Sequence, residues 1–312
     1  MKKTINKETI EGRVYQFNLE VKKVQNTESE NYGKDFISGT LEVAVDEDGL
    51  NVVPVHYTYV TPVTSKGKTN ATYTALAKII SEKKDWVTVG KDNAMMVSLS
   101  PSLSLNEFYD KEDKFVSVKV NEGGFAEIVN SLDAKATFTT DMLINRVTEV
   151  EPDDEKGTPY MVKVGGAVFN FKNELLPVEF TVCEAGQRYF LDLGASASNP
   201  IFTKVWGVIK CSSETIVKTE ESAFGEAAVK SYEKKSKDWI ITGCAKEPYD
   251  FGDESVLTVA EVQKAMQDRE VKIADIKKRQ EEYESKKGSS AKSEPASAAA
   301  VAANIPTGSF KF

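Results

Sequence analysis

The sequence predicts a mainly β protein built from two tandem five-stranded barrels, followed by a long α-helix and a flexible tail. Alternating apolar and polar residues recur through residues 1–250, the pattern repeats at one fixed offset, and the composition changes after residue 250. A chain of 312 residues is also long for a single core. We therefore expect one barrel over residues 1–130, a second over 131–250, a helix over 251–287 and a tail over 288–312.

An internal repeat relates the two predicted barrels. Val52–Val60 resembles Leu175–Cys183, with Pro54 aligned to Pro177 at an offset of 123 residues. The same offset aligns three further segments: Val21, Lys23 and Val24 with Ile144, Arg146 and Val147; Ala44 and Val45 with Ala167 and Val168; Lys114 and Val116–Val118 with Lys237 and Trp239–Ile241. Because one shift aligns four separated strand segments, we infer a duplication.

The first copy is predicted to run strand, strand, strand, helix, strand, strand. The strands cover Arg13–Gln25, Asp35–Asp46, Asn51–Val60, about Ala94–Leu99 and Lys114–Asn121, and the helix covers about Ala71–Lys83. Asp48-Gly49, between two alternating runs, predicts a hairpin turn. Five strands with a helix between the third and fourth is the order of an oligonucleotide/oligosaccharide-binding (OB) barrel, and a small β-sandwich is the main alternative.

The second copy repeats this order over about Ala136–Ala245. Its clearest strands are predicted at Pro159–Phe171, Leu175–Cys183, Phe202–Cys211 and Asp238–Gly243. Thr258-x-x-Glu261 then fits a capping box, and apolar residues at roughly helical spacing continue to about Tyr283. This thin stripe predicts a helix packed on the second barrel, or one used for self-association or a partner. Residues 288–307, rich in Ser, Ala and Pro, predict disorder.

Composition excludes several classes of protein and site. The net charge of −8 and 40% hydrophobic residues are typical of a soluble globular protein, and no apolar run suits a signal peptide or a membrane span. We therefore expect a cytoplasmic protein. Three widely spaced cysteines predict reduced core thiols. With His56 as the single histidine, no C-x-x-C pair and no marked carboxylate pair, we expect no metal, no cofactor and no catalytic site, hence no enzyme.

The tandem barrels, the low-complexity tail and the aromatic tip Gly308–Phe312 together resemble single-stranded DNA-binding proteins, particularly those of phage replication. The resemblance implies sequence-independent binding of single-stranded DNA, or of RNA, in replication or recombination. It also implies a tip that recruits replication or recombination proteins, here through Phe310 and Phe312. For a viral protein, the compartment would be the host-cell cytoplasm. The alternative is a virion or other assembly protein built from duplicated β-domains.

Single-strand binding requires aromatic rings on which bases stack and lysines that follow the phosphates. Both copies carry candidates. In the first copy they are Tyr32, Lys34, Phe36, Tyr57, Tyr59, Lys66, Lys68 and Tyr73; in the second they are Tyr160, Lys163, Phe169, Phe171, Lys172, Lys204, Trp206 and Lys210. Strand parity leaves Tyr57, Tyr59 and Trp206 open between core and groove, and it predicts that Phe169 and Phe171 are exposed or lie at an interface. One continuous groove would favour nucleic acid binding, and scattered clusters would favour assembly.

Overall fold

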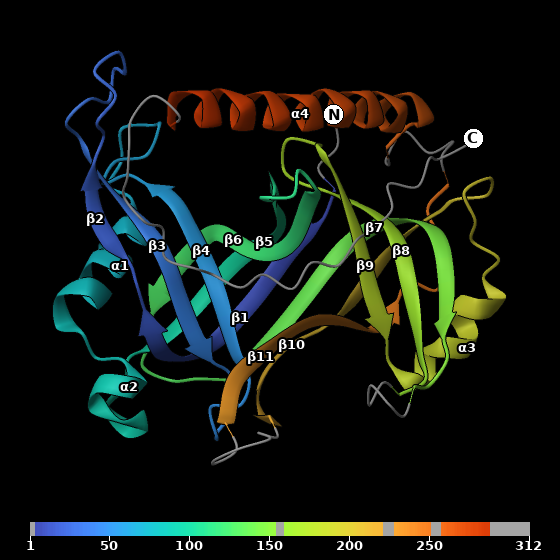
Figure 1. Cartoon of the computed structure of the whole chain (residues 1–312), viewed down its shortest axis with the longest axis horizontal. Coiled ribbons are helices and arrows are strands. Elements are labelled where there is room, and N and C mark those ends of the chain that lie inside the picture. Colours follow the sequence, from blue (N-terminus) through green and yellow to red (C-terminus); the bar gives the residue numbers. More distant parts are fainter. Residues whose placement is uncertain (1–3, 154–158, 221–227, 251–256, 288–312) are drawn as a thin grey trace.

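The computed structural model describes residues 4–153, 159–220, 228–250 and 257–287 as a mainly β protein with a long C-terminal helix (Figure 1). The strands are β1 Asn6–Phe17, β2 Glu20–Lys23, β3 Asp35–Ala44, β4 Val52–Val60, β5 Met96–Tyr109, β6 Phe115–Ile128, β7 Lys135–Val150, β8 Met161–Phe169, β9 Leu175–Val182, β10 Ile201–Glu220 and β11 Ala228–Cys244. The helices are α1 Ala71–Glu82, α2 Trp86–Val89, η1 Lys91–Asn93, α3 Glu184–Asp192 and α4 Val259–Lys287. None of the helices in these ranges is long and apolar enough to span a membrane.

The strands pair into one large sheet in which each half returns on itself. β1 pairs with both β3 and β5, so β1, β3, β4, β6 and β5 form a ring; β7, β8, β9, β11 and β10 form a second ring through the β10–β7 pairing. The β4–β6 and β11–β9 pairings are parallel. The rings lie side by side in Figure 1, joined where Asn6–Glu11 of β1 pairs with Lys135–Thr140 of β7.

Local sequence signals account for several element boundaries. Gly49 has a φ of +69° in the turn between β3 and β4, as the predicted hairpin requires. Asn70 caps α1, because its side chain accepts a hydrogen bond from the Thr72 amide at 3.1 Å. The Thr258 amide donates to Glu261 at 2.9 Å, and the Glu261 amide donates to the Thr258 hydroxyl at 3.3 Å. This exchange confirms the predicted capping box of α4.

The first predicted strand and part of the repeat alignment are wrong. The segment expected as one strand from Arg13 is split, because β1 ends at Phe17 and β2 forms a short separate strand against β3. Val43 pairs with Val14, whereas its aligned residue Gly166 pairs with Ile144. The counterpart of Ile144 is therefore Val14 and not Val21. The last two strands of each half extend well beyond their predicted bounds, and α2 was not predicted.

The two halves share a core and several buried polar contacts. The Trp239 indole of β11 donates to the Glu8 carboxylate of β1 at 2.8 Å, and the Lys119 ammonium of β6 lies 4.8 Å from the centre of the Trp239 ring. Asn51 donates to the Ile209 carbonyl at 3.2 Å and accepts from the Cys211 amide at 2.8 Å. These contacts fix the second half against the first.

Helix α4 packs on both halves and crosses the top of the molecule in Figure 1. Near its N-terminus, Val262 and Ala265 join an apolar cluster of the second half that includes Phe169 and Phe202. Farther along, Arg269 forms a bidentate ion pair with Glu107 of β5 in the first half, with both side chains buried. The helix therefore packs on the second half, as one of the sequence-based alternatives predicts, and also on the first half, which the sequence did not predict.

Candidate functional site

Three depressions meet at Tyr59, near the end of β4. One, of about 610 Å³, is lined by Lys22, Lys23 and Phe36, and a second, of about 620 Å³, lies beside it along Lys34 and Thr61. The third, of about 1060 Å³, extends from Thr61 to the β8–β9 loop of the other half. Tyr59 lines all three, so they form one surface, which we call the Tyr59 groove.

The end of β4 explains why Tyr59 is exposed. Side chains of β4 alternate between buried and half-buried positions as far as Tyr57, but Thr58 and Tyr59 both face outward. The parallel partner β6 pairs with β4 only at Val55 and His56, and the pairing of β4 with β3, which continues to Val60, shifts register between Tyr57 and Val60. The Tyr59 ring packs on Phe36 of β3 with a centroid distance of 4.8 Å and stays 47% exposed. One aromatic face is thus supported from behind and open in front.

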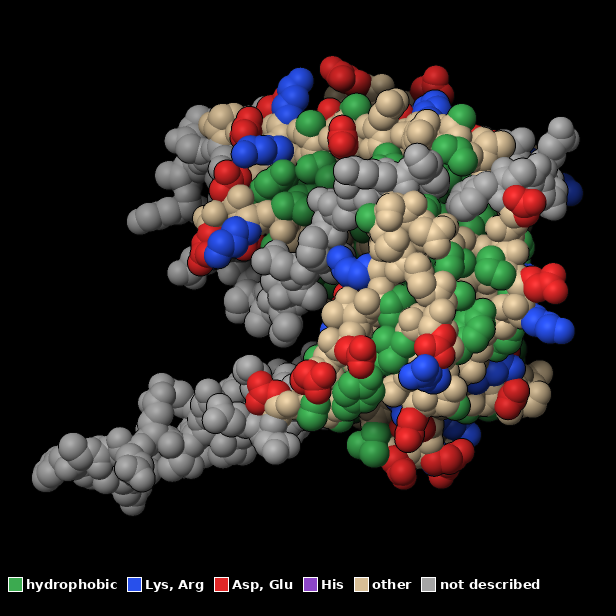
Figure 2. Space-filling view, turned by 90° about the vertical axis from the view of Figure 1, so that its right-hand side faces the viewer, with side chains coloured by type: hydrophobic (Ala, Val, Ile, Leu, Met, Phe, Trp, Pro, Cys, Tyr) green, Lys and Arg blue, Asp and Glu red, His purple; other side chains and the backbone are tan. Residues whose placement is uncertain are grey.

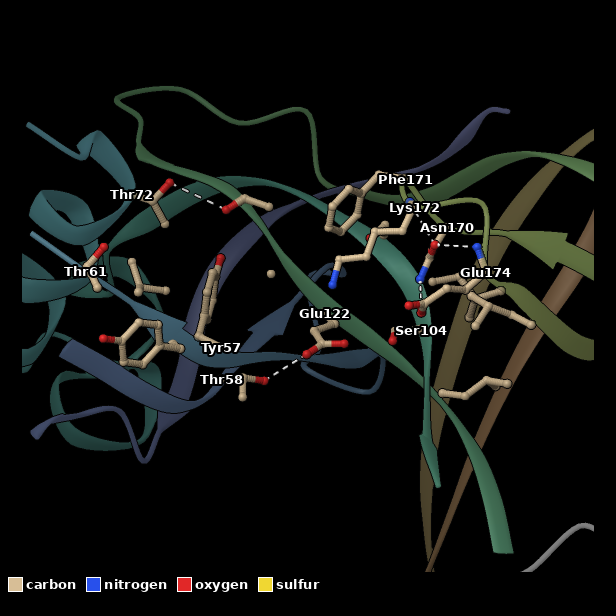
Figure 3. A pocket seen from close by; sticks show the side chains of 18 of the residues that line it. Tyr57, Thr58, Thr61, Thr72, Ser104, Glu122, Asn170, Phe171, Lys172 and Glu174 are labelled. Carbon is tan, nitrogen blue, oxygen red and sulfur yellow. Dashed lines mark hydrogen bonds between the residues drawn. The ribbon is translucent and has the colours of Figure 1, made fainter. Parts of the chain in front are cut away.

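Figure 3 shows the third depression, which lies between the two halves. On one wall, the Thr58 hydroxyl donates to the Glu122 carboxylate at 2.8 Å. On the other wall, the Phe171 ring is 76% exposed, and its neighbour Lys172 holds its ammonium 5.6 Å from the ring centre. The buried Tyr57 hydroxyl has no hydrogen-bond partner among the described residues. Burial raises the pKa of Tyr57, so this hydroxyl remains a neutral donor.

Lysines from four separate segments surround the groove. They are Lys22 and Lys23 of β2, Lys34 before β3, Lys172 in the β8–β9 loop and Lys272 of α4. Three of these lysines form ion pairs at 3.3–3.6 Å, with Glu20, Asp35 and Glu174. Solvent-exposed pairs of this kind contribute only about 0–1 kcal/mol, so an anionic ligand can compete for the ammonium groups. Acidic and basic side chains are likewise interspersed on the face of the molecule that Figure 2 shows.

The structure brings together part of the predicted first-copy cluster. Lys34, Phe36 and Tyr59 lie on the groove. Tyr57 lines it too, but its ring is buried in the core, which leaves no face for a base. The others do not line it: Tyr32, Lys66 and Lys68 are exposed in loops, and Tyr73 packs partly against the core from α1.

In the predicted second-copy cluster, Phe171 and Lys172 reach the groove and the others do not. Of the two predicted surroundings of Phe169, exposure is wrong: the ring is buried beside Phe202, in the cluster outside the main core that α4 covers. The remaining members have other surroundings: Tyr160 donates to Glu149, Lys163 pairs with Glu179, and Lys204, Trp206 and Lys210 follow β10, where Trp206 packs on Gly243. Phe310 and Phe312 lie outside the described residues.

Several groove residues were not predicted. Lys22 and Lys23 form an exposed pair on β2, which the sequence signals only as a polar run. Glu122 and Lys272 carry no local signal, because they reach the groove only through the β4–β6 pairing and the packing of α4. His56 lies on β4 as expected, with Nδ1 2.9 Å from the Thr40 hydroxyl; burial lowers its pKa. Among the described residues, no group of three His, Cys, Asp or Glu side chains is suited to a metal ion.

Comparison with known proteins gives a family and a weak structural likeness. The wild-type single-stranded DNA-binding protein from Thermus aquaticus aligns with a TM-score of 0.47 and 11% identity, over 82% of this chain and 98% of that one. A deletion mutant of the same protein aligns at 0.46 and 11%, over 81% and 100%. No curated protein sequence matches significantly. The YorF family model matches residues 5–279. The chain therefore belongs to the YorF family.

Proposed function

We propose that this protein binds single-stranded nucleic acid, DNA in the first place, along the Tyr59 groove and without recognising a defined sequence. The observation that carries the proposal is the open face of Tyr59 at the meeting point of three depressions that lysines border. An aromatic face accepts any base, with about 1–3 kcal/mol per stacked base, and lysines neutralise the phosphates on either side. Phe171 supplies a second exposed ring on the far wall.

The strand order supports a specific architecture for this function. We propose that residues 1–130 and 131–250 are two OB-like barrels, because each ring has a helix between its third and fourth strands and a parallel pairing of the third with the fifth. OB barrels bind oligonucleotides on the face of their second and third strands and on the adjoining loops. In the first ring these strands are β3 and β4, on which Phe36 and Tyr59 lie.

The described residues that line the groove offer aromatic rings and ammonium groups, which serve binding, so we propose a binding protein and not an enzyme. Covering exposed strands in replication or recombination, as a phage-type protein would, is a role consistent with stacking and phosphate contacts alone. Phe310 and Phe312 remain the proposed contacts for partner proteins. One observation favours the assembly alternative instead: Trp206 is 41% exposed on β10, away from the groove.

The proposal is tested by anisotropy of a fluorescein-labelled mixed-sequence 20-mer at 50 and 200 mM NaCl, with duplex as control. Neutralising five phosphates gives a log–log salt slope of about −3.5, so affinity for the single strand falls roughly 100-fold between these concentrations. Tyr59→Ala weakens binding by about 10- to 100-fold. Tyr189→Ala on α3 is the matched control, since Tyr189 is 41% exposed and does not line the groove.

Absence of binding at 50 mM NaCl would refute the proposal, and so would equal affinities of the two tyrosine variants. If the protein binds no nucleic acid but forms ordered multimers that Trp206→Ala disrupts, the assembly function is supported instead.

A further inference from the structure

We propose that Glu122 makes the Tyr59 groove discriminate among bases, with cytosine, adenine and guanine preferred to thymine and uracil at the position between Tyr59 and Phe171. The inference rests on the proposed function and adds a modest preference at one position to a surface that otherwise accepts any sequence. The feature that carries the inference is an unpaired carboxylate. In the described part of the chain, Glu122 is the one acidic side chain on the groove wall that no cation neutralises.

The carboxylate of Glu122 is fixed in direction and open to a ligand. It extends from β6 beside the end of β4, and one of its oxygens accepts from the Thr58 hydroxyl at 2.8 Å (Figure 3). Its other oxygen has no hydrogen bond within the residues that the structure describes, and the side chain is half-buried. A held acceptor of this kind is suited to reading a donor on a base edge.

The contrast with Glu174 on the opposite wall isolates this feature. The Glu174 carboxylate accepts from the Asn170 amide at 2.8 Å and pairs with the Lys272 ammonium at 3.6 Å. In the described ranges of the chain, no Lys or Arg nitrogen lies within 4.0 Å of the Glu122 carboxylate. Within the described residues, Glu122 therefore faces the groove without an ion-pair partner, whereas Glu174 is paired with Lys272.

This charge orients a bound strand. Phosphates are repelled from Glu122 and attracted to Lys172 and to the lysines on β2, so the backbone follows the rim and the bases point inward. A base stacked on Tyr59 or Phe171 then turns its edge toward Glu122. A carboxylate only accepts hydrogen bonds, and it pairs with the exocyclic amino groups of cytosine, adenine or guanine. Thymine and uracil offer on this edge only N3–H, which lies between two carbonyl oxygens that a carboxylate repels.

The test compares 15-mers of deoxycytidine and deoxyuridine, which differ only in the hydrogen-bonding groups at positions 3 and 4 of the base. Anisotropy is measured at pH 8.0 and 100 mM NaCl, after circular dichroism has verified that each variant is folded. The wild-type protein should bind the cytidine strand at least about fivefold more tightly, on the order of 1 kcal/mol.

Glu122→Gln supplies an amide that also donates, so the ratio should fall to within about twofold, chiefly through tighter binding of the uridine strand. Glu174→Gln is the matched control, because it removes the same charge from the other wall; affinity for both strands rises together and the ratio stays as in the wild type.

The outcomes separate this inference from the proposed function. Equal wild-type affinities for the two strands would overturn the discrimination but leave single-strand binding intact. A wild-type preference that persists in Glu122→Gln would mean that another group reads the base, which overturns the role of Glu122. If the protein binds neither of the two 15-mers nor the mixed-sequence 20-mer, the proposed function itself is refuted.

Discussion

Removing the Glu107 carboxylate is expected to release the C-terminal part of α4 from the first half of the protein. Both oxygens of Glu107 bond to the Arg269 guanidinium, one of them to Nη1 at 2.9 Å. The Glu107 and Arg269 side chains are 2% and 6% exposed, and Arg269 Nε has no hydrogen-bond partner among the described residues. In Glu107→Gln the guanidinium would remain buried without a counter-charge.

The burial of this pair sets the magnitude. Deleting one partner of a buried ion pair costs about 3–5 kcal/mol, whereas an exposed pair contributes about 0–1 kcal/mol. Beyond Arg269, the helix is held to the first half by Lys277, which pairs with Asp113 at 3.3 Å and lies over the Tyr109 ring. Those exposed contacts are weaker than the penalty for an unpaired buried charge. The end of α4 therefore detaches, which increases its local opening about 100-fold or more.

Hydrogen exchange read by mass spectrometry over α4 measures this opening. Glu107→Gln should accelerate exchange about 100-fold, and Asp113→Asn, which breaks the exposed pair, only a few-fold. The double variant Glu107→Leu, Arg269→Met removes both charges and should recover most of the protection. Unchanged protection in Glu107→Gln would refute the reasoning, as would a double variant that exchanges as fast as the single one.

Three further predictions concern contacts between the strands. Asn51→Ala leaves the Ile209 carbonyl and the Cys211 amide without their partner, so calorimetry should show about 1–3 kcal/mol less stability; an unchanged Tm would contradict this. Burial raises the pKa of Glu8 from 4.5 to about 7, above its unfolded value, so stability falls as pH rises between these values. The free energy of unfolding in urea should therefore differ between pH 5 and pH 7.5 in the wild-type protein, and Glu8→Gln should remove this difference. A difference that persists in the variant would exclude Glu8 as its source. Gly243→Ala would place Cβ 2.5 Å from the Trp206 indole nitrogen, so tryptophan emission should shift; an identical spectrum would count against the packing.

The sequence predicts the central strands well, because their alternation is a direct record of burial. The predicted start and end of the strand at Asn51–Val60 differ from β4 by at most one residue, and Leu175–Cys183 differs from β9 by one. Tyr57 and Tyr59 have the same parity, yet one is buried and the other exposed. The difference arises where the β3–β4 pairing shifts register between Tyr57 and Val60, which parity does not encode.

Phe169 and Lys272 show what local patterns omit. Phe169 has the opposite parity from Val164 and Val168 of the main core, as the sequence indicates, but α4 covers this outer face of β8, so the ring is buried. Lys272 is one of many charged residues on a long helix, and only the packing of α4 on both halves brings it to the groove. The local part of the candidate site was therefore predictable, and the part contributed by the other half was not.

The pairing of β1 with β7 has a consequence for cutting the chain into pieces. A fragment of residues 1–130 would retain β1 but lack β7, and the backbone amides and carbonyls of Asn6–Glu11 would lose the ladder that pairs them. An uncovered strand edge is a template for pairing with another chain, so this fragment would tend to dimerise or aggregate when expressed alone. The smallest well-behaved expression unit is thus the pair of halves, even though each contains a complete ring of strands.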